Sequence, residues 1–317
     1  MENKRKNMEE ISALNSPRFS QIATFARLPV SRNLEGLDSV FVGVPFDTGT
    51  TYRTGARFGP SSVREESRIL RPFSLSSNTM PFEKLNVADY GDIEVFPLDI
   101  ERTIGSVKST LSNMFRAHIF PLVCGGDHSV TLGVLRAIAE SEGPVSLVHF
   151  DSHFDFWDQY QGYKYNHGTW LRRALDEGLV KNVYQVGIRG SAYSTDDLEF
   201  ARSNGIHVKT IYEIRERGFE NVMQEVCKGI SKEGAVHVSI DIDSVDPAFA
   251  PATGTPEIGG LTSWEITRAV RLLLEYRVKC LDVVEISPVY DHPGKITSVL
   301  GANIFYEALA TIAKKKN

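Results

Sequence analysis

The chain alternates between short apolar segments and longer amphipathic segments along most of its length. The apolar segments are rich in β-branched residues and end in Gly, Asp or Pro, which predicts strands at 39–44, 119–124, 145–150, 183–188, 235–240 and 279–284, and a weaker strand at 207–211. Apolar residues at helical spacing predict helices near 60–70, 99–117, 129–141, 195–204, 219–231, 263–276 and 297–313. Because the strands are almost continuously apolar, helices are expected to cover both faces of the sheet. The predicted fold class is therefore α/β, a single-domain doubly wound parallel sheet sandwiched by helices.

Residues 1–37 fit no periodic unit. We predict that they form an N-terminal arm used in subunit contacts, and that one domain covers residues 38–317. The chain has 317 residues, and single α/β domains of this length occur, so the absence of a linker-like segment favours one domain over two.

Composition and charge exclude several classes of partner. An apolar fraction of 42% and a charged fraction of 24% are ordinary for a soluble globular protein. The net charge of -5 and the lack of a long Lys/Arg run argue against nucleic-acid binding. The first ten residues resemble no targeting signal, and no window of eighteen apolar residues predicts a membrane span. Three cysteines in apolar surroundings indicate free thiols in a reducing compartment, so we predict a cytoplasmic protein.

Ionisable side chains gather where four of the predicted strands end. They are Asp127 and His128, then Asp151, His153 and Asp155, then Asp241, Asp243 and Asp246, and finally Glu285. Any one of these acidic residues alone is typical of a helix cap or a turn. Ligands of open α/β sheets, however, bind beyond the carboxyl ends of the strands, so the whole set is expected at one edge.

Four of these residues are the main reason to predict a metal site. Asp151, Asp155, Asp241 and Asp243 would repel one another if they met without cations. Two divalent ions remove that repulsion, since carboxylates can bridge a pair of ions. Oxygen donors with a minority of imidazole suit Mn²⁺, with Ni²⁺ as the alternative, and the lack of thiolates argues against a structural zinc site.

Several motifs extend this pattern into a family resemblance. They are Gly-Gly-Asp-His-Ser at 125–129, Asp-Ser-His-Phe-Asp at 151–155, Ser-Ile-Asp-Ile-Asp-Ser-Val-Asp-Pro at 239–247, Gly-Thr-Pro at 254–256 and Glu-Ile-Ser-Pro at 285–288. Together they resemble the ureohydrolase (arginase/agmatinase) superfamily, and the segments at 43–60 and 167–173 resemble its agmatinase-like branch. The resemblance implies an arginase-like fold and a hydrolase that acts on C–N bonds of linear amidines.

The resemblance also implies a role for each site residue. One metal position would use His128, Asp151, Asp155 and Asp241, and the other would use Asp151, His153, Asp241 and Asp243. The nucleophile would be a metal-bridging hydroxide held by Asp155, Glu285 would pair with the guanidinium group, and His167 would pass a proton to the leaving amine. Ser152 occupies a position where the family commonly has Ala, and we expect its side chain to point away from the metals.

The substrate is expected to be a guanidino compound other than arginine. The segment 156–166 is dense in aromatic residues where arginase has a polar loop, and Phe154, Trp170 and Thr255 are candidates for the substrate wall. A small or weakly polar guanidine, such as a guanidino acid, agmatine or guanidine itself, would suit such a wall and would give urea plus an amine or ammonia. The alternative is that the rings only fill space between the loop and the sheet.

Two other functions compete with this interpretation. A formimino-compound hydrolase would share the metal site but release formamide. A non-catalytic subunit of a hetero-oligomeric ureohydrolase would be expected to lack ligands, and none of the six is missing. By resemblance to its relatives, the protein is also expected to be a homo-oligomer, either a trimer or a hexamer.

Overall fold

The computed structural model describes residues 12–230 and 234–316. Its centre is a sheet of eight strands in the order β2-β1-β3-β8-β7-β4-β5-β6, and every pair of neighbours is parallel. The strands are β1 (Ser39–Gly43), β2 (Val87–Asp92), β3 (Phe120–Cys124), β4 (Val145–Phe150), β5 (Val180–Ile188), β6 (His207–Thr210), β7 (Val236–Asp241) and β8 (Val278–Val284).

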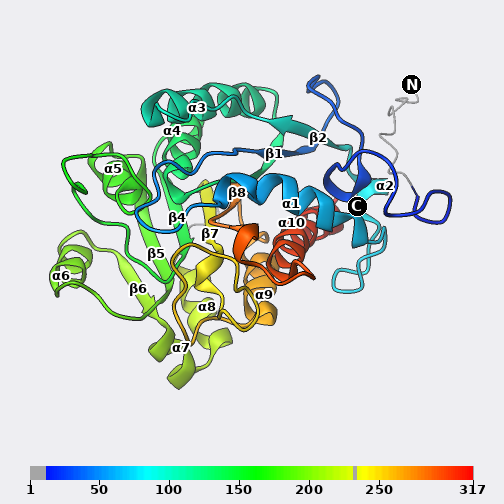
Figure 1. The fold of residues 1–317 in the computed structure, drawn as a ribbon. Coiled ribbons are helices and arrows are strands. Elements are labelled where there is room, and N and C mark those ends of the chain that lie inside the picture. The colour runs from blue at the N-terminus through cyan, green and yellow to red at the C-terminus, as the bar shows by residue number, and fades with distance from the viewer. Residues whose placement is uncertain (1–11, 231–233, 317) are drawn as a thin grey trace.

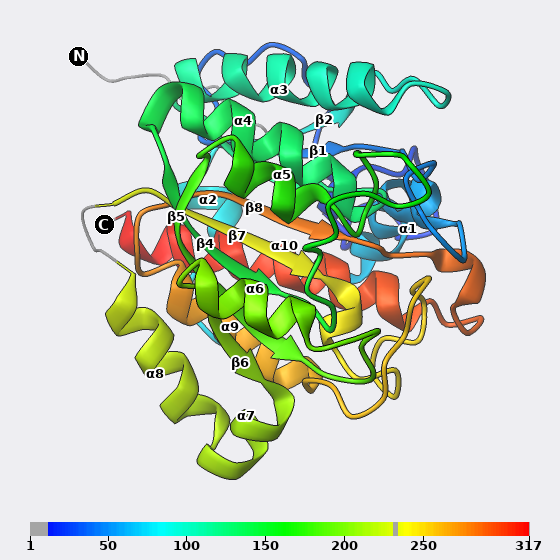
Figure 2. The ribbon, with the colours of Figure 1, turned by 90° about the vertical axis from the view of Figure 1, so that its left-hand side faces the viewer.

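Helices cover both faces of this sheet (Figure 1). They are α1 (Gly59–Glu66), α2 (Pro81–Lys84), α3 (Ile100–Arg116), α4 (Thr131–Glu142), α5 (Trp170–Asp176), α6 (Asp196–Ser203), α7 (Ile211–Arg217), α8 (Phe219–Gly229), α9 (Ser263–Leu273) and α10 (Ile296–Lys315). Figure 2 places α3, α4 and α5 on one face, and α8, α9 and α10 on the other.

Alternate residues of a strand enter two separate hydrophobic cores. Phe41 of β1 belongs to the core that also contains residues of α8, α9 and α10, whereas Val40 and Val42 belong to the core that contains residues of α3, α4 and α5. Successive side chains of a strand point to opposite faces, so an apolar run buries both sides of the sheet. The predicted doubly wound α/β sheet is confirmed, and its seven predicted strands all form.

The sequence pattern missed one strand and three short helices. β2 reads Val-Ala-Asp-Tyr-Gly-Asp, which has too few apolar residues to predict an edge strand. Asp89, in its middle, is 1% exposed and accepts hydrogen bonds from Arg64 Nε at 2.8 Å and from the backbone N–H of Phe25 at 2.8 Å. The buried carboxylate is therefore stabilised by residues that are distant in the sequence. The hydrophobic periodicity of the chain does not reveal such contacts. The missed helices, α2, α5 and α7, are only four to seven residues long.

Part of the predicted N-terminal arm packs into the core. Phe25 is fully buried and stacks on Phe41 of β1 with ring centres 4.6 Å apart, and Leu28 is 2% exposed. Residues 1–11 lie outside the described residues, so the arm's use in subunit contacts stays a prediction. The described part of the arm is continuous with the domain that carries the sheet.

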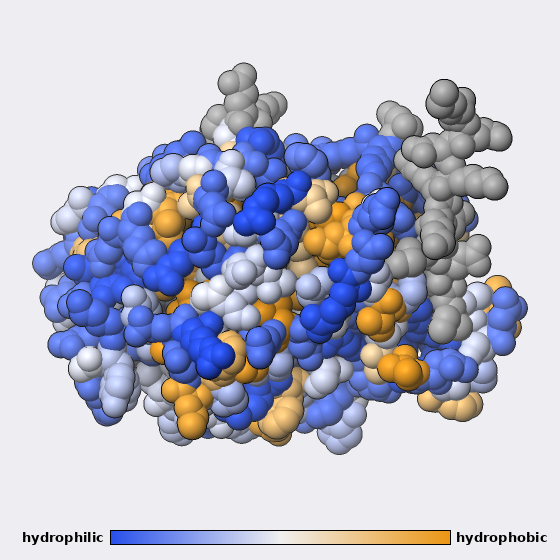
Figure 3. Space-filling model, turned by 90° about the horizontal axis from the view of Figure 1, so that it is seen from above, coloured by the Kyte–Doolittle hydropathy of each residue, from blue (hydrophilic) through white to orange (hydrophobic). Residues whose placement is uncertain are grey.

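One helix of the described residues has the length and composition of a membrane span. It is α10, whose mean hydropathy reaches 1.4 over eighteen residues, but 72% of that window is buried inside the protein. It lies against α1 and α9 on one face of the sheet (Figure 1), as expected for a core helix. The surface seen in Figure 3 is mostly hydrophilic, with apolar side chains in small separate patches, which is ordinary for a folded protein surface.

Candidate metal centre

The predicted ionisable residues meet at the carboxyl ends of four neighbouring strands. β3, β8, β7 and β4 are adjacent in the sheet and all run in the same direction, so the segments that follow them leave at one edge (Figure 2). These segments contain His128, Asp151 to Asp155, Asp241 to Asp243 and Glu285. The parallel topology thus brings together side chains that are up to 157 residues apart in the chain.

One imidazole nitrogen faces three carboxylates in the first half of the cluster. His128 Nδ1 lies 3.2 Å from Asp151 Oδ2, 3.2 Å from Asp241 Oδ2 and 3.5 Å from Asp155 Oδ2. The other ring nitrogen, Nε2, lies 2.9 Å from Ser239 Oγ, which in turn donates to Asp282 Oδ1 at 2.5 Å. A histidine anchored through one nitrogen presents the other in a fixed direction, which is how proteins orient metal ligands.

The second half of the cluster shares Asp151 with the first. His153 Nδ1 lies 3.1 Å from Asp243 Oδ2 and 3.4 Å from Asp151 Oδ1. Asp151, His153 and Asp243 form one group whose potential ligand atoms all lie within 4.8 Å of one another. The predicted bridging position of Asp151 matches this geometry. Asp241 adjoins His128, and its Oδ1 accepts the backbone N–H of Asp243 at 2.8 Å.

Two side chains of β4 and its extension differ from the sequence-based expectation. His149, which was not predicted, is fully buried with Nε2 2.8 Å from Asp151 Oδ2. The strand alternation that aligns 151, 153 and 155 also includes 149, so this signal was available in the sequence. Ser152 was expected to point away, but its Oγ donates to Asp243 Oδ1 at 2.8 Å. That expectation was wrong because the chain leaves its strand geometry after Phe150.

The donor set fits two divalent cations. Asp151, Asp241 and Asp243 are at most 3% exposed, and buried carboxylates require compensating positive charge. The described residues surrounding them supply imidazole and carboxylate donors without a thiolate, a combination that suits Mn²⁺ or Ni²⁺. Arg189, a nearby buried cation, instead donates to backbone carbonyl groups.

The raised pKa values of several groups in the cluster also indicate that the carboxylates lack compensating positive charge. Burial, followed by repulsion from Asp151, raises the pKa of Asp155 to about 7. Burial and the neighbouring Asp243 raise the pKa of Asp241 well above its usual value. Burial alone would lower the pKa of His128, but its hydrogen bonds to Asp151 and Asp241 outweigh burial and raise it well above the usual value. In the absence of metal, protons are therefore retained where cations would bind.

This retention of protons predicts a pH dependence for the metal-free protein. Asp127, like Asp155, has a pKa raised to about 7, by burial and then by Glu285, against about 3.9 in an unfolded chain. These two carboxyls bind more protons in the folded protein than in the unfolded chain between about pH 4 and about pH 7. The raised pKa of His128 extends the difference above pH 6.5, so stability still falls as pH rises through 7. We expect the melting temperature of chelator-treated protein to fall between about pH 6.5 and about pH 8, and two divalent ions to suppress the fall. A metal-free melting temperature that rises over this interval would contradict the prediction.

Glu285 and His167 form a second unit beside the cluster. Glu285 is 1% exposed and has φ +62°, an uncommon conformation for a residue with a side chain. Its Oε1 accepts the backbone N–H of His128 at 2.9 Å and lies 3.1 Å from His167 Nδ1. His167 Nε2 accepts the backbone N–H of Thr51 at 3.1 Å and lies 2.7 Å from its hydroxyl. Since a backbone N–H can only donate, Nδ1 carries the proton that is shared with Glu285.

The three predicted wall residues occupy different surroundings. Thr255 Oγ1 donates to Asp243 Oδ2 at 3.4 Å, and Phe154 is half-buried with its ring 5.8 Å from that of Phe156. Trp170 is 1% exposed, and its Nε1–H donates to Asp155 Oδ2 at 2.6 Å. Its ring stacks on His128, so Trp170 lies against the cluster, and its contact with substrate stays a prediction.

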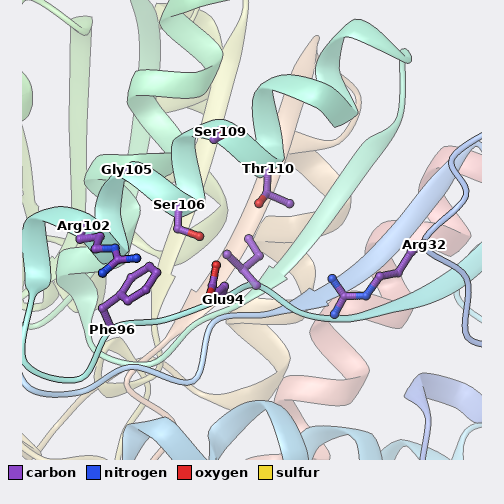
Figure 4. Close-up of a pocket in the computed structure, with 9 residues that line it drawn as sticks. Arg32, Glu94, Phe96, Arg102, Gly105, Ser106, Ser109 and Thr110 are labelled. Atoms are coloured by element: carbon purple, nitrogen blue, oxygen red, sulfur yellow. The ribbon is translucent and has the colours of Figure 1, made fainter.

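A separate surface hollow of about 610 Å³ lies between α3 and the segment that follows β2 (Figure 4). Arg102 and Phe96 lie side by side there, with the guanidinium carbon 3.6 Å from the ring centre. None of the side chains that line the hollow belongs to the predicted site. The hollow and the candidate metal centre are therefore distinct.

The fold and the site define an α/β protein with a buried histidine–carboxylate cluster suited to two metal ions. The family model described as the Arginase family matches residues 37–311, and the chain belongs to this family. It is 41% identical to proclavaminate amidinohydrolase of Streptomyces clavuligerus, over 97% of this chain and 98% of that protein. It is also 41% identical to guanidinobutyrase of Pseudomonas aeruginosa, over 97% of this chain and 98% of the relative. The solved structure of proclavaminate amidinohydrolase from Streptomyces clavuligerus matches this chain with a TM-score of 0.89 and 42% identity, over 94% of this chain and 99% of that one.

Proposed function

We propose that this protein hydrolyses a small guanidino compound to urea plus an amine or ammonia, with two divalent metal ions per chain. The observation that carries the proposal is the buried cluster of His128, His153 and four aspartates, next to the Glu285–His167 pair. Membership of the Arginase family, and relatives named guanidinobutyrase and guanidinopropionase, support it.

The residues assigned to the metals are those of the two halves of the cluster. One position would use His128, Asp151, Asp155 and Asp241, and the other Asp151, His153, Asp241 and Asp243. Two divalent ions held there would lower the pKa of a shared water by many units, which makes it a nucleophile near neutral pH. We propose Mn²⁺, with Ni²⁺ as the alternative, because both accept this mixture of oxygen and nitrogen donors.

Three side chains would act on the substrate and its protons. The buried carboxyl group of Glu285 would pair with the planar guanidinium group through charge-assisted hydrogen bonds. Asp155, on the inner wall of the cluster, would orient the attacking water by accepting a hydrogen bond from it. His167 would deliver a proton to the departing amine, since Nε2 already accepts hydrogen bonds and can receive a proton there. Thr51, which was not predicted from the sequence, would hold that nitrogen in place.

The substrate proposed is a guanidine without a charged amino-acid end. Trp157 and Tyr160 stack with ring centres 5.6 Å apart in the loop 156–166, and Tyr193 approaches Trp157 to 5.9 Å. Asp158, an acidic residue of this loop, is paired with Arg173 at 2.6 Å. Binding arginine against such rings would leave its ammonium and carboxylate groups unpaired, which costs several kcal/mol.

We therefore expect arginine to be a poor substrate. Discrimination of ~3 kcal/mol corresponds to a kcat/KM roughly a hundredfold below that of the best guanidine. Urea release from guanidine, guanidino acids, agmatine and arginine would measure this directly on the metal-loaded protein. A kcat/KM for arginine equal to that of the best alternative would contradict the substrate proposal, and formamide release from a formimino compound in place of urea would contradict the proposed reaction.

We also propose that the protein is a homo-oligomer, a trimer or a hexamer, in keeping with the N-terminal arm that precedes its family domain. Light scattering at micromolar concentration measures the assembly.

A further inference from the structure

Trp170 is buried against the residues assigned to one metal position. It is the first residue of α5 and is 1% exposed. Its indole Nε1–H donates to Asp155 Oδ2 at 2.6 Å. Its ring stacks on His128 with centres 4.6 Å apart and planes at 26°, and it meets His149 edge-on at 5.1 Å. Trp170 thus contacts two predicted ligands of the same metal position: its N–H bonds Asp155, and its ring stacks on His128.

Asp155 is held in a conformation that needs outside support. Its φ is +57°, in the left-handed region that non-glycine residues occupy only uncommonly. The backbone N–H of Arg172 donates to the Asp155 carbonyl at 3.4 Å, while Trp170 binds its carboxylate. The first turn of α5 therefore holds both the main chain and the side chain of Asp155. Backbone strain persists only where surrounding contacts determine the conformation, and it is concentrated at functional sites.

The chemistry of the indole limits what this contact can do. An indole N–H is a donor only, and a carboxylate oxygen has two lone pairs. The bond to Trp170 therefore occupies one direction of Asp155 Oδ2, and the same oxygen lies 3.5 Å from His128 Nδ1. A ring needed for packing alone would not require a polar N–H in a buried position, since a buried donor without a partner is costly.

We propose that Trp170 is a positioning residue, which fixes the Asp155 carboxylate and the His128 imidazole in the geometry that their shared metal position requires. This inference rests on the proposed metal centre. It identifies Trp170 as a residue that sets the metal affinity of one of the two proposed metal positions. The effect passes through the proposed metal ligands, because the indole contacts the carboxylate of Asp155 and the ring of His128.

Trp170→Phe tests the proposal because it keeps an aromatic ring but removes the N–H. Competition of the protein with a chelator for Mn²⁺ should reveal one ion bound about 10–100-fold more weakly, as is typical when a partner of a metal ligand is lost. The second ion should bind as in the wild type. Trp264→Phe is the matched control and should change neither affinity, since Trp264 is 69% exposed on α9. Unchanged affinities for both ions in Trp170→Phe would overturn the inference.

A double-mutant cycle separates positioning from a general loss of structure. If Trp170 acts through Asp155, adding Trp170→Phe to Asp155→Asn should weaken Mn²⁺ binding much less than it does in the wild-type background. Equal losses in both backgrounds would contradict the mechanism. The melting temperature of each metal-free variant, measured in parallel, distinguishes a weakened metal position from a destabilised fold.

A third measurement leaves Trp170 untouched. In the variant Trp157→Phe/Trp264→Phe, Trp170 is the single tryptophan, and its emission should fall on addition of Mn²⁺, whose unpaired electrons quench indoles at contact distance. Emission that stays constant at saturating Mn²⁺ would contradict the inference. A wild type that binds no Mn²⁺ would overturn the proposed function and this inference together. A wild type that binds two ions and releases urea, with a Trp170→Phe variant that binds them equally well, would overturn this inference alone.

Discussion

Asp151→Asn is expected to reduce urea release by about a thousandfold or more and to leave fewer than two metal ions bound per chain. Asp151 belongs to both halves of the cluster, with Oδ2 3.2 Å from His128 Nδ1 and Oδ1 3.4 Å from His153 Nδ1. Replacing the carboxylate by an amide keeps its size but removes a shared anionic ligand. Without both ions the pKa of the attacking water returns to the much higher value of bulk water, so the nucleophile is lost at neutral pH.

Metal analysis of the purified variant, together with a urea assay, checks this result. Asp176→Asn is the matched control, because this exposed aspartate lies on α5 and pairs with Arg172 and Arg173 rather than with a residue of the cluster. It should retain both metal content and turnover. Near-normal turnover with two ions per chain in Asp151→Asn would show that the metal assignment is wrong. Asp241→Asn, at the other proposed bridging position, should behave like Asp151→Asn.

Glu285→Gln is expected to lower kcat/KM for a cationic guanidine by about 10²–10³-fold while metal content stays near that of the wild type. Loss of one partner of a buried charge pair costs roughly 2–5 kcal/mol, and Glu285 is only 1% exposed. The amide oxygen of Gln can still accept the backbone N–H of His128, so the local fold should be preserved. The change therefore isolates the negative charge that we assign to the guanidinium group.

Steady-state kinetics and metal analysis test the role of Glu285 together. Glu199→Gln, an exposed change on α6, serves as the control for substituting a glutamate. An unchanged kcat/KM in Glu285→Gln would remove Glu285 from substrate binding. A loss of bound metal would instead make it a ligand.

The central strands, and the ionisable side chains that meet at their ends, could be predicted from the sequence because both depend on local pattern. A strand buried on both faces is a continuous apolar run, as in 145–150, and the residues that follow such strands meet at one edge. The alternation of Asp151 with His153 predicted a shared face, but the chain leaves strand geometry after Phe150, so Ser152 between them also bonds a residue of the cluster. Each of these side chains lies at the edge of the sheet because it stands within a few residues of the end of a strand.

The elements that could not be predicted depend on contacts between distant segments. β2 contains the buried Asp89, whose carboxylate is paired with Arg64 and accepts a hydrogen bond from the backbone N–H of Phe25. Both partners are distant from β2 in the sequence. Thr51 reaches His167 across 116 residues, and no spacing rule connects them. Trp170 was predicted as a substrate-wall residue because it closely follows His167 in the chain, and its contacts with Asp155 and His128 were not predicted. The direction of its side chain is decided by the short helix α5, which has too few residues to give a periodic signal.

The central claim is that the cluster at the carboxyl ends of the strands holds two metal ions that are needed to release urea from a guanidine. The most direct test strips the protein with a chelator, reloads it with Mn²⁺ or Ni²⁺, and measures urea from the guanidine panel against metal bound per chain. Stripped protein should release no urea, and activity should return as occupancy approaches two ions. Urea release that is independent of bound metal, or no urea from any guanidine at full occupancy, would contradict the account.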